Sequence, residues 1–286
     1  MTGVLCICKP AEITSFGVVA KVRGITRERK AGHTGTLDPM ATGVLPVLLG
    51  GATRFLDYLP DSNKRYLATF RLGETTDTQD CTGTVLTRRE VSVTPGQLTA
   101  VLEHFRGEIM QIPPMYSALK VNGQKLCDLA RKGRQVERQP RPVTIHELTL
   151  LSREGDTLRL RVRCSKGTYI RTLCTDIGEA LGCGGCMQAL RRTQAGEYTI
   201  AEAVPLQQLL EAAEPETYLR DVDTMFRGYP AVKLTANQEK RCRNGNAFSV
   251  SLPGGTYRAY SQSGEFLMLA KVEDGVMSTI KSFFDV

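Results

Sequence analysis

The loop from Gly32 to Pro39 is the part of the chain that could best hold a single catalytic carboxylate. Its sequence is Gly-His-Thr-Gly-Thr-Leu-Asp-Pro, so two glycines and an Asp-Pro step constrain the backbone around Asp38. A carboxylate held rigidly in this way can act as a nucleophile or a base. An Asp-Pro pair more often marks a turn or a helix N-cap, and these residues alone leave that alternative open. The role of His33 is also undecided by these residues, since it could be a core histidine or a group that stacks on a ligand.

The segment from Leu119 to Val143 concentrates positive charge. It holds seven basic residues against Asp128 and Glu137, a net charge of +5. Lys and Arg side chains of this kind contact phosphates, although many charge runs are only solvated loops. Because the whole chain carries a net charge of +7, most of that charge lies here, and we favour a nucleic acid contact. The candidate side chains are Lys120, Lys125, Arg131, Lys132 and Arg134.

No motif in the sequence predicts a metal or a cofactor. The phosphate-binding patterns G-x-x-x-x-G-K-[ST] and G-x-G-x-x-G are missing, and so is H-E-x-x-H. Cys183 and Cys186 have zinc-knuckle spacing, but no second pair lies at a compatible distance, so structural thiols are favoured over a zinc site. Asp77 and Asp80 lie in a threonine-rich loop, which favours side-chain-capped turns over a cation site. We therefore expect neither a cofactor nor a metal.

Composition places the chain among ordinary globular proteins with a basic balance. Its 286 residues suit one large domain or a large domain with a small one, and 41% are hydrophobic. With 37 Lys and Arg against 30 Asp and Glu, a polyanion is the leading class of partner. The apolar runs are too short to span a bilayer, no signal peptide is visible, and the nine scattered cysteines favour reduced thiols. We expect a cytoplasmic protein without membrane contact.

The elements that must position these residues do not alternate regularly. A helix should follow Thr14 and end near Gly24, and another should begin at a capping box formed by Thr94 and Gln97. Strict alternation predicts a half-buried strand over Leu158 to Cys164. This irregular order predicts an α+β (mixed α/β) fold with a largely antiparallel sheet.

Several strings of the chain resemble, in order, the TruB family of tRNA pseudouridine synthases. The match runs from about Gly3 to Thr193, and the ordered series is far more specific than any single piece. The strings are Lys9–Pro10, Thr14–Ser15, Gly32–Gly43, Lys64–Tyr66, Thr76–Gly83, Pro114–Lys120, Cys164–Thr172 and Leu190–Arg192. Where the family often has a tyrosine after the Lys-Leu of the second basic motif, this chain has Cys127.

The resemblance implies that the chain isomerises uridine 55 in the T-loop of tRNA to pseudouridine, after flipping the base out of its stack. Asp38 resembles the essential carboxylate and Tyr66 the aromatic residue that stacks on the target base. Arg171 resembles the partner that orients Asp38, and such a pairing predicts a lowered pKa for that carboxyl. Tyr169 and Leu190 resemble the walls of the uracil pocket. His33 resembles the residue that fills the space left by the flipped bases.

The resemblance also divides the chain and limits its partners. It implies a catalytic domain over 1–228, with a basic thumb loop inserted at about 119–143, and a small β-rich PUA-like RNA-binding module over 229–286. The tRNA T-arm is the expected partner, and we expect a monomer without an obligate protein partner.

Three alternatives remain at this stage. They are a non-catalytic RNA-binding or tRNA-folding protein, a guide-RNA-dependent synthase acting on ribosomal RNA, and a metal-dependent RNA hydrolase.

Overall fold

The computed structural model describes residues 1–60, 63–121 and 123–284, and its largest element is a ten-stranded sheet. The strand order is β14-β1-β3-β12-β4-β11-β10-β7, with β13 beside β12 and β2 beside β3. The strands are β1 (Gly3–Lys9), β2 (Ala31–His33), β3 (Thr42–Leu49), β4 (Lys64–Leu72), β7 (Gly107–Gln111), β10 (Arg141–Glu154), β11 (Thr157–Cys164), β12 (Gly185–Ala195), β13 (Tyr198–Thr199) and β14 (Val204–Pro205). All pairs except β1–β14 and β3–β12 are antiparallel, so the expected α+β fold with a largely antiparallel sheet is confirmed.

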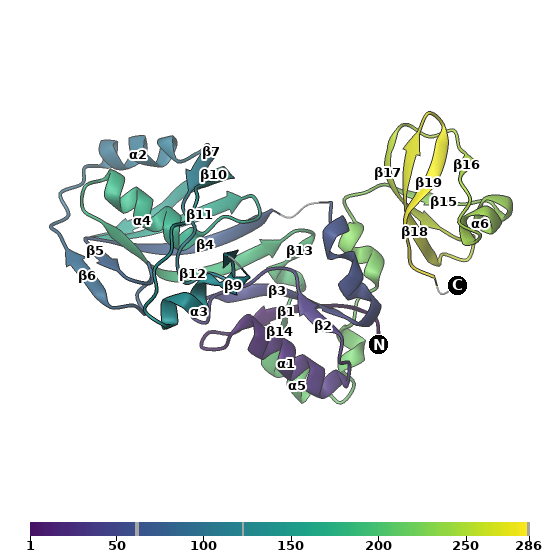
Figure 1. The fold of residues 1–286 in the computed structure, drawn as a ribbon, viewed down its shortest axis with the longest axis horizontal. Helices are drawn as coiled ribbons and strands as arrows, with labels where there is room; N and C mark the ends of the chain where they lie inside the picture. The colour runs from purple at the N-terminus through teal and green to yellow at the C-terminus, as the bar shows by residue number, and fades with distance from the viewer. Residues whose placement is uncertain (61–62, 122, 285–286) are drawn as a thin grey trace.

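Helices cover the sheet and the loops at its ends (Figure 1). The α-helices of this part are α1 (Ser15–Thr26), α2 (Pro95–His104), α4 (Ile170–Ala180) and α5 (Leu206–Glu211). Short 3₁₀ helices are η1 (Gly50–Tyr58), η2 (Ile200–Glu202), η3 (Pro215–Tyr218) and η4 (Val222–Phe226). The capping box of Thr94 and Gln97 is present at the start of α2, as predicted. No helix of the described residues is both long and apolar enough to span a bilayer.

The predicted end of the first helix at Gly24 is wrong. Thr14 caps α1 by accepting a hydrogen bond from Gly17, but the helix continues to Thr26 and ends where Arg27 adopts a positive φ of 54°. The inner face of α1 buries Val18 and neighbouring valines against the sheet, and this packing outweighs the small cost of one glycine in a helix.

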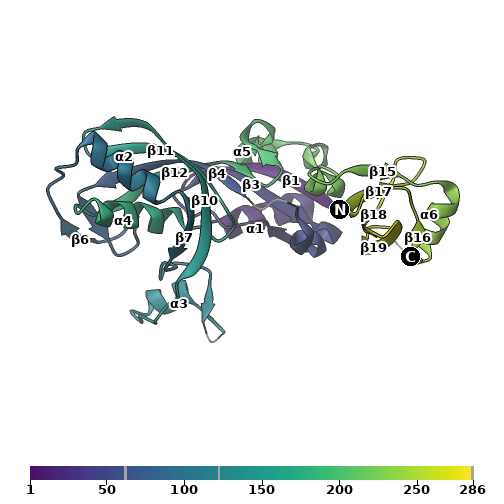
Figure 2. The same ribbon diagram turned by 90° about the horizontal axis from the view of Figure 1, so that it is seen from above.

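A projecting arm leaves the sheet between β7 and β10 (Figure 2). It carries the hairpin of β8 (Lys120–Val121) and β9 (Gln124–Lys125), followed by α3 (Leu126–Arg131). Leu126 and Leu129 are its buried anchors. A second hairpin, β5 (Glu74–Thr76) with β6 (Val85–Arg88), lies near α4 at the end of the sheet shown on the left of Figure 1.

The end of the chain forms a separate five-stranded sheet at the opposite end of the molecule (Figure 1). Its order is β15-β17-β18-β19-β16. Its elements are β15 (Ala231–Lys233), α6 (Ala236–Arg243), β16 (Phe248–Ser249), β17 (Gly255–Tyr260), β18 (Phe266–Glu273) and β19 (Val276–Ser282). The ring of Phe283 packs 4.0 Å from that of Phe55 in η1, so this sheet is joined to the main body by apolar contact.

Candidate active site

Asp38 lies in the loop between β2 and β3, and neighbouring elements fix the backbone of that loop. The hydroxyl of Ser15 on α1 accepts a hydrogen bond from the Leu37 amide at 2.8 Å and donates one to the Leu37 carbonyl at 2.9 Å. The Ala41 amide closes a turn onto the Asp38 carbonyl at 3.0 Å. The Asp-Pro step is therefore a turn, and the same turn presents a carboxylate whose side chain stays 29% exposed.

Arg171, at the start of α4, binds this carboxylate with two groups. Its Nε lies 2.9 Å from Asp38 Oδ2, and its Nη2 lies 3.1 Å from Oδ1. The guanidinium also donates to the carbonyls of Thr78 at 3.1 Å and Tyr116 at 2.8 Å. The expected pairing of Asp38 with Arg171 is thus present, and it connects the Asp38 loop, the loop after β5 and the base of the projecting arm.

The predicted lowering of the Asp38 pKa is wrong. Burial raises the pKa of this carboxyl above its ordinary value, because the charged form loses its water. The Arg171 cation lowers the pKa, and the nearby Asp80 anion raises it again. The ion pair therefore offsets only part of the cost of burying the charge.

Asp80 is a member of the site that the sequence did not identify as one. Its Oδ1 accepts hydrogen bonds from the Thr78 hydroxyl at 2.8 Å and from the Thr82 hydroxyl at 2.6 Å, so the predicted side-chain-capped turn is confirmed. The other carboxyl oxygen lies 3.9 Å from Arg171 Nε. Asp80 thus places a second negative charge on the same guanidinium, and only the three-dimensional arrangement reveals it.

Tyr66 lies on β4 and is 95% buried, with Arg192 of β12 opposite it in the strand register. Burial raises the pKa of its phenol to about 12, so the hydroxyl is protonated at neutral pH. The negative charge of Asp38 raises the pKa of this phenol as well. Leu190 is two residues before Arg192 on the same strand and is also buried.

Tyr169 is held by Gln111, the last residue of β7. The Tyr169 amide donates to Gln111 Oε1 at 3.0 Å, and Gln111 Nε2 donates back to the Tyr169 carbonyl at 3.3 Å. Burial raises the pKa of the Tyr169 phenol, and the charges of Arg171 and Asp38 also act on it. Gln111 was not predicted as a site residue, because nothing in the local sequence distinguishes it from an ordinary strand residue.

His33 ends β2, five residues before Asp38. Its Nδ1 is buried and has no hydrogen-bond partner among the described residues. Burial lowers the pKa of the imidazole, and the Arg192 cation lowers it further, so the ring is neutral at pH 7.

The basic candidates lie on the projecting arm of Figure 2. All five are exposed, and Arg131 makes a long contact of 3.5 Å with Asp128. Residue 122, inside the expected thumb loop, lies outside the described residues. The arm thus presents cations to solvent on a segment anchored by buried leucines.

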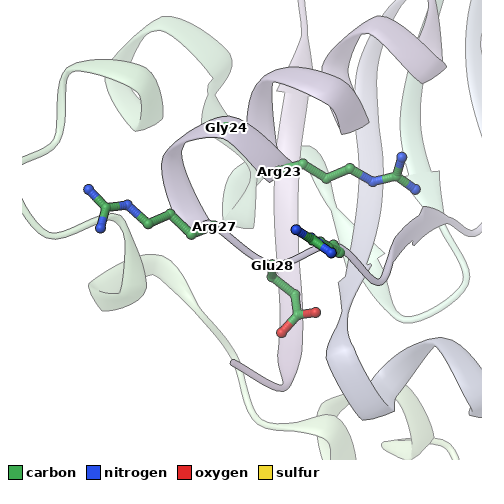
Figure 3. A pocket seen from close by; sticks show the side chains of 5 residues that line it. Arg23, Gly24, Arg27 and Glu28 are labelled. Atoms are coloured by element: carbon green, nitrogen blue, oxygen red, sulfur yellow. The ribbon is translucent and has the colours of Figure 1, made fainter.

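A hollow at the end of α1 is distinct from this site (Figure 3). It is lined by Arg23, Gly24, Arg27, Glu28 and Arg29. In Figure 3 the side chains of Arg23 and Arg27 extend to opposite sides, and Arg23 Nη2 donates to the Ala31 carbonyl at 2.7 Å. Glu28 accepts a hydrogen bond from the N-terminal amine at 3.1 Å. Arg23 and Glu28 thus make contacts within the fold, and Asp38 remains the candidate for chemistry.

The described residues contain no cluster of three or more His, Cys, Asp or Glu side chains arranged to hold a metal ion. Cys183 and Cys186 are both buried.

Comparison with known proteins matches most of the chain to two family models. Residues 23–170 match the TruB family pseudouridylate synthase (N terminal domain), and residues 171–222 match the tRNA pseudouridylate synthase B C-terminal domain. A protein named tRNA pseudouridine synthase B from Clostridium kluyveri is 42% identical, over 99% of this chain and 100% of its own length. Its namesake from Pseudomonas fluorescens Pf-5 is 47% identical, over 96% of this chain and 93% of its own length.

A solved structure supports the same assignment. The crystal structure of a Cbf5-Nop10-Gar1 complex matches with a TM-score of 0.74 and 26% identity, covering 99% of this chain and 85% of that one. A structure of an H/ACA RNP bound to a substrate RNA shares the fold, with a TM-score of 0.74 at 24% identity. Together with the ordered motifs around Asp38 and Arg171, these matches show that the chain belongs to the TruB family of pseudouridylate synthases.

Proposed function

We propose that this protein is a tRNA pseudouridine synthase that isomerises uridine 55 of the T-loop. The observation that carries the proposal is the bidentate Asp38–Arg171 pair, in which the arginine is buried while the Asp38 side chain stays 29% exposed. The relatives at 42% to 47% identity are named tRNA pseudouridine synthase B. That level of identity exceeds the 26% shared with the Cbf5 structure, and the names of these more similar relatives favour tRNA as the substrate.

The reaction is an isomerisation with no net redox change. The bond between uracil N1 and ribose C1′ breaks, the base turns within the site, and a bond forms between C5 and C1′. N1 gains a proton and C5 loses one, so atoms and electrons balance without a cofactor. Asp38 is the group that attacks, either at C1′ or on the base, and its carboxylate must be ionised to do so.

Each further site residue has a role that its surroundings support. Tyr66 stacks on the uracil and, being protonated, can exchange a proton with the sugar. Tyr169 and Leu190 form the walls of the pocket. Arg171 orients Asp38 and balances its charge after burial.

His33 fills the space left when the T-loop bases flip out. Its neutral imidazole suits that role, because an uncharged ring stacks between bases at a lower desolvation cost than a charged one.

The projecting arm is the thumb, which closes on the phosphates of the T-arm. Lys120, Lys125, Arg131, Lys132 and Arg134 supply the cations. Residues 1–228 would then form the catalytic domain, with 119–143 as the thumb and 229–286 as a PUA-like RNA-binding module. The start of the second sheet at Ala231 supports the boundary between residues 228 and 229. Residues 285–286 of the proposed module lie outside the described residues. We further propose that the protein acts as a monomer on tRNA alone, in the cytoplasm.

The test is direct. Incubation of the purified chain with an unmodified tRNA transcript should produce one pseudouridine in the T-loop, detected by carbodiimide modification and primer extension. A parallel incubation with chelator separates isomerisation from metal-dependent hydrolysis, since only the latter should stop. Intact tRNA with no pseudouridine would leave the non-catalytic RNA-binding alternative standing.

A further inference from the structure

Arg192 is a fully buried cation that donates hydrogen bonds to backbone carbonyls. It lies on β12, where the preceding Arg191 points outward and is exposed. Its Nε donates to the Val44 carbonyl at 2.7 Å. Its Nη2 donates to Gly35 at 3.0 Å, and its Nη1 makes a longer contact of 3.4 Å with Thr36. One guanidinium therefore joins β3 to the loop that leads into Asp38.

Burying the Arg192 guanidinium costs free energy, so we expect its contacts to have a role in the site. A buried charge is normally paired with an opposite charge, because desolvation of an unpaired ion costs several kcal/mol. Within residues 1–60, 63–121 and 123–284, no ion pair joins Arg192 to a carboxylate. An apolar side chain would fill the same space at lower cost, but it could not connect three carbonyls.

A second buried cation holds the other side of the same turn. Lys9 donates from Nζ to the carbonyls of Pro39 at 3.0 Å, Pro10 at 2.8 Å and Ile13 at 2.7 Å. Asp38 thus lies between two clamped points, one just before it and one just after it. Lys9 is fully buried, as Arg192 is, so two buried cations bind the backbone on either side of Asp38.

Arg192 also adjoins the strand that carries the stacking tyrosine. In the sheet register it lies opposite Tyr66 of β4 on one side and Gly43 of β3 on the other. A Cβ added at Gly43 would lie 2.1 Å from the Arg192 carbonyl oxygen, so the two backbones are too close together to admit a side chain at position 43. The residue therefore contacts both structural units whose separation must be fixed: the Asp38 loop and the Tyr66 strand.

We infer that Arg192 is a positioning residue, which sets the placement of Asp38 relative to Tyr66 through the carbonyls of Gly35, Thr36 and Val44. This inference rests on the proposed function. The fork geometry matters more than the charge, because separate guanidinium nitrogens meet Val44 on β3 and Gly35 on the loop, whereas a lysine offers one nitrogen at one position. Loss of the fork should loosen the loop and misplace the carboxylate, and misplacement by about 1 Å can cost about 100-fold in rate.

The experiment compares Arg192→Lys and Arg192→Met with the matched control Arg191→Met, which removes the neighbouring exposed guanidinium. Stoichiometric tRNA titration gives the fraction of binding-competent protein, and single-turnover kinetics then give the rate per competent molecule. We expect about a 10- to 100-fold lower rate for both Arg192 variants, with tRNA affinity unchanged. The control should keep the rate of the unmodified chain. Hydrogen exchange of the Leu37 and Ala41 amides should accelerate only in the Arg192 variants.

Rate per competent molecule separates positioning from mere stability. A purely structural role would lower the melting temperature and the competent fraction but leave that rate normal, and this result would overturn the inference. If Arg192→Met does not fold, Arg192→Lys decides: a normal rate in the lysine variant would equally overturn it. The protein without substitutions provides the separate test of the proposed function, because its failure to form pseudouridine would refute the activity itself.

Discussion

Arg171 binds Asp38 through two nitrogens, with Nε 2.9 Å from Oδ2 and Nη2 3.1 Å from Oδ1. The same Nη2 donates to the Tyr116 carbonyl at 2.8 Å, at the base of the thumb. The planar guanidinium holds these donors on separate nitrogens in fixed directions, whereas an ammonium would have only one nitrogen to share among them. The orientation of the carboxylate is therefore coupled to the backbone from which the thumb emerges.

Replacing Asp38 by Asn should abolish turnover and retain tRNA binding. The amide keeps the size of the side chain but can neither attack nor accept a proton as a base, and such losses are commonly 100- to 10,000-fold or more. Single-turnover pseudouridine formation and a filter-binding titration measure the two properties separately. Normal conversion by this variant would show that Asp38 is not the essential group.

Replacing Arg171 by Lys should lower the single-turnover rate by about 10- to 100-fold, because the fork that orients Asp38 is lost while one positive charge is kept. Arg161→Lys is the matched control. Arg161 forms an ion pair of 2.6 Å with Glu147 on the exposed sheet surface, where such pairs contribute about 0–1 kcal/mol. Equal rates for the two variants would contradict a special role for the Arg171 fork.

The pH dependence of the single-turnover rate should report the raised pKa of Asp38. The reaction needs the carboxylate, so the rate should rise with pH through this pKa, at a higher pH than an ordinary aspartate would give. Asp80 raises the pKa of Asp38, so Asp80→Asn should shift the acidic limb to lower pH. An unmoved limb, or one that moves to higher pH, would contradict this electrostatic coupling.

Neutralising Arg131, Lys132 and Arg134 to Gln should weaken tRNA binding and flatten its salt dependence. If all three contact phosphates, the slope of log K against log salt should fall by about 2 to 3. Arg88→Gln is a control of the same chemistry, since Arg88 is exposed but paired with Glu74 at 3.1 Å. A slope that stays the same in the triple variant would argue against the thumb as a phosphate contact.

Gly43→Ala should destabilise the protein more than Gly107→Ala. Both glycines have positive φ, 102° and 88°, so both alanines carry strain of about 1–3 kcal/mol. Only at Gly43 would the new Cβ also meet a backbone atom, the Arg192 carbonyl at 2.1 Å, whereas nothing lies within 4 Å of the Gly107 position. Urea unfolding of both variants measures the difference, and equal losses would mean that the contact at Gly43 relaxes freely.

The local sequence pattern correctly predicted those elements that are stabilised by residues adjacent in the chain. The capping box at Thr94 and the alternating strand before Cys164 are where the sequence placed them, because cap hydrogen bonds and side-chain alternation depend on a few adjacent residues. The sequence wrongly placed the end of the first helix at Gly24. Packing of α1 against the sheet, which is a non-local contribution, outweighed the low helix propensity of glycine.

The sequence by itself determined the family, since the ordered motifs from Lys9 to Arg192 are enough to identify it, and with the family came the expected pairing of Asp38 with Arg171. Tertiary structure decided how those side chains behave. The pKa of Asp38, the part played by Asp80 and the carbonyl clamp of Arg192 all depend on groups distant in the chain and on water removed by packing. Burial and charge act through space, so their net effect on a site depends on where the fold puts each group, which the order of residues does not state.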